Sequence, residues 1–234
     1  MRTLGVDLAA QPKGTAACEI NWETGDVWVR NGADDADLIR AARDTLGSGG
    51  LVAIDAPFGW PVEFVQAISR HAAHERFGSA ATPELRLRRT DRRVSGRLPL
   101  SVSSDRIAIV AFRAARLLDE LGPLRRDGSD RVIEVYPAAA LRRWGLERPG
   151  YKKDAGARGW ISSAIEAALP ALGIAAVRVS FGASDDALDA LIAALVGRAK
   201  SLDLVDPIPA DDVDVALVEG WIWLPTADAL RRLG

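Results

Sequence analysis

The first 31 residues contain three short strand patterns separated by tight turns, and this spacing limits the possible folds more than any other feature of the chain. Residues 3–8 alternate between apolar and other positions. Two more strand patterns follow at residues 14–20 and 27–30, with only a few residues between them. A parallel crossover needs about a dozen connecting residues or more, so the segment predicts an antiparallel meander.

After the meander, helical and strand patterns alternate. Residues 51–54 form an uninterrupted apolar run, which is typical of a strand buried on both faces. Further strand patterns occupy residues 132–136, 174–179 and 218–225, and helical patterns occupy residues 37–46, 62–76, 107–121, 137–144, 160–169 and 184–200. This order predicts an α/β fold with a mixed sheet, in which the antiparallel three-strand meander is joined by parallel strands and flanked by helices.

One interval departs from this alternation. Residues 60–131 combine helical patterns with a basic stretch rich in Gly, Ser and Pro, and we predict an inserted helical arm within a single domain spanning residues 1–234. The arm has 14 basic and 9 acidic residues, a net charge of +5, whereas the remainder has 16 and 23, a net charge of −7. The overall charge of −2 therefore conceals two regions of opposite sign.

Composition excludes several classes of protein. Cys18 is the only cysteine, so a secreted disulfide scaffold is excluded, and a zinc ribbon is excluded because no Cys/His cluster occurs. No apolar run approaches the roughly 18 residues of a membrane span. Asp7 interrupts the stretch that a signal peptide would need to be apolar. We therefore expect a cytoplasmic protein.

Carboxylates interrupt otherwise apolar elements in four parts of the chain. A buried carboxylate is costly unless it is paired or bound to a metal, so several such interruptions call for a common explanation. A divalent cation is the simplest one, because Mg²⁺ and Mn²⁺ prefer oxygen ligands and a two-metal site needs carboxylates from different elements. The candidate catalytic and metal-binding residues are Asp7, Asp55, Glu134, Asp186 and Asp189.

Structural explanations for some of these acids stay open. Ser184, Asp185 and Asp186 together make a favourable helix N-terminus, which could account for both aspartates. Asp189 lies beyond the first turn, where capping gives it no role. Asp55 could merely begin a turn before Ala-Pro.

Glu134 also has an alternative explanation. It lies inside the apolar sequence Val-Ile-Glu-Val-Tyr, where it could pair with a buried arginine instead of binding a metal.

Seven short motifs, in order along nearly the whole chain, are similar to those of a known family. They are Gly5-Val6-Asp7-Leu8-Ala9-Ala10, Ile54-Asp55-Ala56-Pro57, Arg89-Thr90-Asp91, Glu134-Val135-Tyr136-Pro137, Gly150-Tyr151-Lys152, Asp185-Asp186-Ala187-Leu188-Asp189-Ala190 and Glu219-Gly220-Trp221-Ile222. Together they resemble a family of uncharacterised prokaryotic proteins described as predicted RNase H-like nucleases, domain of unknown function 429. The resemblance implies an RNase H-like fold and phosphodiester hydrolysis with two metal ions, Mg²⁺ or Mn²⁺.

The wider RNase H-like group implies roles for individual acids. Its Holliday-junction resolvases place an Asp in the first strand, an acid at the end of the fourth strand and an Asp-x-x-Asp pair at the start of the last helix. Asp7, Asp55 and the pair Asp186 and Asp189 match this pattern. Glu134 is an additional acid outside it and could be a family-specific ligand.

A nucleic-acid partner, either RNA or DNA, would contact the basic side chains. The arginines that crowd the middle of the arm are Arg86, Arg88, Arg89, Arg92, Arg93 and Arg97. They could bind phosphates, but a solvated surface loop would have the same composition, because aromatic residues for base stacking are missing from this stretch. The resemblance marks Arg89, Asp91, Tyr151 and Lys152 as substrate-binding candidates, and Trp60, close to Asp55 in the sequence, could line the site.

Three functions compete at this stage. The leading hypothesis is a metal-dependent nuclease. A nucleotide-dependent phosphotransferase or ATPase related to the actin-like proteins is the second, because residues 5–7 followed by Gly14 and Thr15 loosely resemble a phosphate loop; the chain is short for the duplicated domain of such proteins. The third is a non-catalytic nucleic-acid-binding scaffold.

Overall fold

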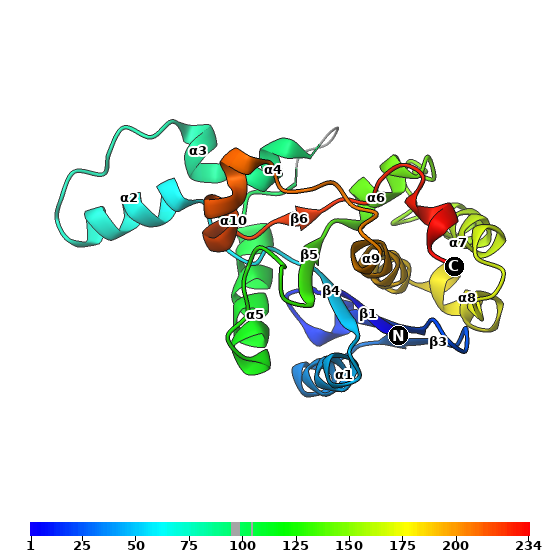
Figure 1. Ribbon diagram of the computed structural model, residues 1–234. Coiled ribbons are helices and arrows are strands. Elements are labelled where there is room, and N and C mark those ends of the chain that lie inside the picture. Colours follow the sequence, from blue (N-terminus) through cyan, green and yellow to red (C-terminus); the bar gives the residue numbers. More distant parts are fainter. Residues whose placement is uncertain (95–98, 104) are drawn as a thin grey trace.

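The computed structural model describes residues 1–94, 99–103 and 105–234 (Figure 1). Arg97, one of the clustered arginines, lies outside the described residues. One six-stranded sheet has the order β3-β2-β1-β4-β5-β6. Its strands are β1 (Arg2–Asp7), β2 (Ala16–Asn21), β3 (Val27–Asn31), β4 (Leu51–Asp55), β5 (Val132–Val135) and β6 (Ile222–Trp223).

The sheet is mixed, as predicted. Strands β1, β2 and β3 form the antiparallel meander, and β4, β5 and β6 continue the sheet from β1 in parallel. In the β1–β4 pair Asp7 lies opposite Asp55, and in the β4–β5 pair Glu134 lies opposite Ile54. The carboxyl ends of the parallel strands therefore bring the three strand acids to one edge of the sheet.

Helices cover both faces of the sheet (Figure 1). They are α1 (Asp35–Gly47), α2 (Val62–Ala72), α3 (Thr82–Arg86), α4 (Arg89–Arg93), α5 (Asp105–Leu121), α6 (Pro137–Arg143), α7 (Ala155–Ala168), α8 (Ile174–Ala183), α9 (Asp185–Ser201) and α10 (Val213–Glu219). Helix α9 lies across β1, β4 and β2 and is covered in turn by α6, α7 and α8, while α1 and α5 pack on the opposite face. In the part of the chain that the structure describes, no helix is both long and apolar enough to cross a membrane.

A glycine allows α9 to lie directly on the sheet. A Cβ atom at Gly5 would stand 2.1 Å from the carbonyl oxygen of Ala190 and 2.3 Å from the amide nitrogen of Ala194. Small buried residues on α9 complete this close contact. Because Gly5 is two residues before Asp7, the contact also fixes the start of α9 beside the end of β1.

One strand prediction was wrong, and another was too long. Residues 174–179 belong to helix α8, because Ile174, Val177 and Phe181 pack into the core at a helical spacing of three and then four residues. Of residues 218–225, only the pair in β6 forms a strand, because α10 continues to Glu219 and Gly220 then reverses the chain with a φ of 84°.

The predicted arm contains α2, α3, α4 and α5. Helix α5 joins the core, where Val110 and Ala114 pack with Ile54 of β4. Helix α2 projects away from the sheet (Figure 1, left). The segment between β4 and β5 therefore combines a core helix with more exposed short helices, and its status as a separate arm stays a prediction.

Candidate active site

Asp7 and Asp55 lie side by side at the carboxyl ends of β1 and β4, and both are partly buried. Burial, followed by the negative charge of Asp189, raises the pKa of Asp55 to about 8. Burial, Asp55 and Asp189 raise the pKa of Asp7 well above its usual range. Like charges thus repel one another across the two strand ends.

The start of α9 brings further acids to this edge. Ser184 caps the helix by accepting a hydrogen bond from the backbone amide of Ala187, so the predicted N-terminus is confirmed. Asp186, in the first turn, stays partly exposed, and its pKa is raised by burial and by Asp185. Asp189, one turn later, is only 1% exposed. The helix therefore contributes one accessible and one buried carboxylate.

Tyr151 and Lys152 share the carboxylate of Asp189. The Tyr151 hydroxyl donates to Oδ1 at 2.9 Å, and the Lys152 ammonium lies 2.9 Å from Oδ2. Burial alone would lower the pKa of Lys152, but the neighbouring carboxylates, chiefly Asp189, raise it above the ordinary lysine value. The Lys152 side chain is still 56% exposed, so its ammonium contacts the acidic site from the solvent side.

A buried arginine holds the loop that carries these two residues. The Arg158 guanidinium on α7 donates to the carbonyl oxygen of Tyr151 at 2.9 Å and to that of Gly182 at 2.7 Å. It thereby connects the Tyr151 loop to the segment that leads into α9. Sequence reasoning did not identify Arg158, although it shares the buried face of α7 with Ile161 and Ile165, and that helical spacing is the signal that could have found it.

Glu134 is paired with a buried arginine, the alternative that the sequence left open. Arg88 donates to both oxygens of Glu134, at 2.6 and 2.8 Å, and the backbone amide of Phe58 donates to Oε2 at 2.9 Å. Burial raises the pKa of Glu134 despite the opposing effect of Arg88. Glu134 still acts on the neighbouring site, because its charge helps to raise the pKa of Asp55.

The Arg89-Thr90-Asp91 motif connects α4 to the C-terminal elements. Asp91 is buried and binds the Arg88 guanidinium at 2.9 and 3.2 Å. The backbone amide of Arg89 donates to buried Glu219, and the hydroxyl of Thr90 accepts from the amide of Ile222. The Arg89 side chain is half exposed and lies 3.7 Å from Asp212. Of this motif, only the Arg89 guanidinium extends to the surface.

The acidic edge has the ligand chemistry for a hard divalent cation but is not arranged as a finished metal centre. Among the described residues, no group of three or more His, Cys, Asp or Glu side chains could hold a metal ion as it stands. Lys152 already binds one oxygen of Asp189, and Arg88 binds both oxygens of Glu134. Asp7, Asp55 and Asp186 keep oxygens without an ion-pair partner in the described part of the chain.

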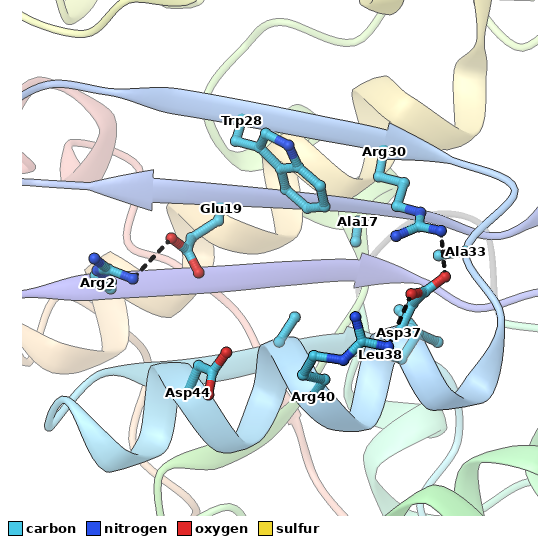
Figure 2. Close-up of a pocket in the computed structure, with 11 residues that line it drawn as sticks. Arg2, Ala17, Glu19, Trp28, Arg30, Ala33, Asp37, Leu38, Arg40 and Asp44 are labelled. Atoms are coloured by element: carbon cyan, nitrogen blue, oxygen red, sulfur yellow. Dashed lines mark hydrogen bonds and ion pairs between the residues drawn. The ribbon is translucent and has the colours of Figure 1, made fainter.

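A concavity of about 320 Å³ lies elsewhere, between α1 and the β2–β3 side of the sheet (Figure 2). Trp28 lies across it, and its charged side chains pair with one another: Arg30 with Asp37, and Arg2 with Glu19. None of the candidate acids lines it. We therefore place the candidate active site at the strand ends.

Comparison with known proteins gives one match. The family described as "Protein of unknown function (DUF429)" matches residues 5–214. Comparisons with curated proteins and with solved structures gave no match. The matched region includes all nine candidate site residues.

Proposed function

The chain belongs to the DUF429 family of proteins of unknown function, and we propose that it is a nuclease that hydrolyses phosphodiester bonds with a divalent cation, Mg²⁺ or Mn²⁺. The substrate would be a nucleic acid, either RNA or DNA. We propose a cytoplasmic location, since the single cysteine is buried and unpaired.

One observation carries this proposal: carboxylates from three separate elements, β1, β4 and α9, meet at one edge of the sheet. Asp55 and Asp189 both raise the pKa of Asp7, and Asp189 raises that of Asp55. A protein core gains nothing from such repulsion. Perturbed acids gathered at a strand end are instead a common feature of sites that bind cations or transfer protons.

The residues present suit a hard cation by their chemistry. Asp7, Asp55 and Asp186 would hold it after their side chains move together, since carboxylate oxygens are the ligands that Mg²⁺ and Mn²⁺ prefer. When bound, the cation would activate a water molecule and stabilise the leaving oxygen of the phosphodiester. Its charge would also relieve the repulsion that raises the pKa of these acids.

The remaining site residues would position the substrate. The Lys152 ammonium has three donors and uses one on Asp189, so its exposed side can donate to a phosphate oxygen. Tyr151 fixes Asp189 from the protein side. Arg89, half exposed at the start of α4, is a second cation available to the backbone of the substrate.

The test is cleavage of labelled single-stranded, branched and RNA-containing substrates with Mn²⁺. Wild type should cleave at least one of them, and Asp7→Asn should abolish cleavage while leaving the circular dichroism spectrum unchanged. Asp44→Asn, an acid on α1 outside the site, is the matched control and should cleave like wild type. Equal cleavage by Asp7→Asn would reveal a contaminating nuclease and remove the support for this site.

A non-catalytic scaffold is the second candidate, and the Lys152–Asp189 ion pair favours it. A lysine in the acidic site can offset negative charge without any metal. Titration calorimetry with Mn²⁺ separates the two functions. Binding that weakens strongly in Asp7→Asn supports the nuclease, whereas absence of binding supports the scaffold.

A further inference from the structure

Two aromatic rings stack on one another at the surface of the α5 side of the molecule. The rings of Trp60 and Phe112 have centroids 5.5 Å apart and planes 30° apart. Phe112 is 52% exposed, and Trp60 is partly exposed. Large exposed rings are costly in water, so a stacked, half-open pair calls for a ligand with a flat face.

The pair lies at the same edge of the sheet as the carboxylates. Trp60 follows Asp55 by five residues, a span of at most about 18 Å. On α5, Arg113 directly follows Phe112 and donates to the hydroxyl of Thr15 at 2.6 Å and to the carbonyl oxygen of Ala9 at 2.8 Å. Thr15 directly precedes Ala16, which lies opposite Asp7 in the β1–β2 pair. The two rings are therefore anchored close to both strand ends that carry the acids.

The exposed face of α5 adds a positive charge to the rings. Ile109, Phe112 and Arg116 follow one another at helical spacing and are all exposed. Arg116 makes no ion pair with any residue that the structure describes, so its guanidinium is available. An apolar side chain, an aromatic ring and a guanidinium with no ion-pair partner among the described residues thus share one helix face.

We propose that the Trp60–Phe112 pair binds an unpaired base of a single-stranded nucleic acid whose backbone runs toward the carboxylate site. This inference rests on the proposed nuclease function and names its substrate class. Every base has a π face that can stack on an aromatic ring, and the guanidinium of Arg116 supplies a contact for the adjacent phosphate. Bases inside a duplex are already stacked and cannot offer that face without being extruded.

Charge favours a nucleic acid over an apolar protein segment on this face. The Arg116 guanidinium stands one turn from Phe112 on the exposed face of α5, beside the stacked rings. A polyanion with flat bases complements both properties, whereas an apolar peptide would leave Arg116 without a partner.

The experiment measures binding separately from cleavage. Fluorescence anisotropy with a labelled twelve-residue oligothymidylate in EDTA excludes cation-dependent cleavage. Phe112→Leu keeps an apolar side chain but removes the ring, and we expect roughly 5- to 150-fold weaker binding, the range found when one base loses an aromatic partner. Arg116→Gln should reduce the slope of log affinity against log salt concentration by about 1, the change expected when one phosphate contact is lost. Phe77→Leu, another exposed phenylalanine past the far end of α2, is the matched control.

An abasic oligonucleotide of the same length isolates the contribution of the base. Wild type should bind it more weakly than oligothymidylate, and this difference in affinity should shrink in Phe112→Leu. If Phe112→Leu keeps wild-type affinity, or loses affinity equally for both oligonucleotides, the stacking proposal is wrong. Cleavage with Mn²⁺ is scored independently: binding through Phe112 without cleavage refutes the nuclease alone, and cleavage that Phe112→Leu leaves unchanged refutes the stacking alone.

Discussion

Replacing Arg88 with methionine should destabilise the protein more than almost any other single substitution. The five N–H groups of the guanidinium all donate: two to Glu134, two to Asp91 and one to the carbonyl oxygen of Glu219. Arg88, Glu134 and Asp91 are each at most 2% exposed. The variant would leave two buried carboxylates facing each other with no cation.

The magnitude follows from this arrangement. Breaking a buried ion pair by removing one partner costs about 3–5 kcal/mol, and here one arginine serves two acids, so we expect the upper part of that range. For a chain of this size, such a loss lowers the melting temperature by roughly 6 to 20 °C. The deficit should shrink at acidic pH, because the abandoned acids would have raised pKa values and become neutral there.

Urea unfolding followed by circular dichroism measures the effect. Arg92→Met is the matched control, since Arg92 is exposed on the same short helix and its side chain makes one weak hydrogen bond to a carbonyl oxygen. It should change the free energy of unfolding by less than about 0.5 kcal/mol. A loss below about 1 kcal/mol in Arg88→Met would refute the view that this arginine neutralises the two acids.

Three further results are expected. The pKa of Asp55 is raised to about 8, so the free energy of unfolding of the cation-free protein should fall as the pH rises from 4 to 8, by up to about 6 kcal/mol. Asp55→Asn should flatten this pH profile, which urea unfolding measures. Mn²⁺ should raise the melting temperature of wild type and leave that of Asp7→Asn unchanged in a thermal shift assay. Gly5→Ala should cost several kcal/mol in urea unfolding, because its Cβ would overlap the carbonyl oxygen of Ala190, and a loss below 1 kcal/mol would show that α9 can shift freely.

The sheet and the meeting of the strand acids could be predicted from the sequence. Short turns require antiparallel neighbours, and parallel strands end at a common edge, so Asp7 and Asp55 had to lie close together. Helix α8 was predicted as a strand because Val177 and Val179 favour strands locally, yet Val179 is 85% exposed and the core contacts follow a helical period. Tertiary packing outweighed local propensity.

The partners of the acids could not be predicted in the same way. Glu134 needed a cation, and the sequence offered 26 arginines without showing which one is buried. Arg88 differs from its neighbours in the crowded stretch because it reaches Glu134 of β5 and the carbonyl oxygen of Glu219, which are contacts between distant parts of the chain. The Lys152–Asp189 pair likewise depends on a loop whose position Arg158 fixes.

The hydrogen bonds from Arg88 and Thr90 to the C-terminal elements also bear on the order in which the site can form during synthesis. Arg88 and Glu219 are 131 residues apart, and Thr90 and Ile222 are 132 residues apart. A nascent chain that has reached β5 contains Glu134 and Arg88 but neither α9 nor β6. Asp7 and Asp55 can meet as soon as β1 and β4 pair, but Asp189 joins them only when the last quarter of the chain has left the ribosome, and its part of the mutual repulsion arises only then.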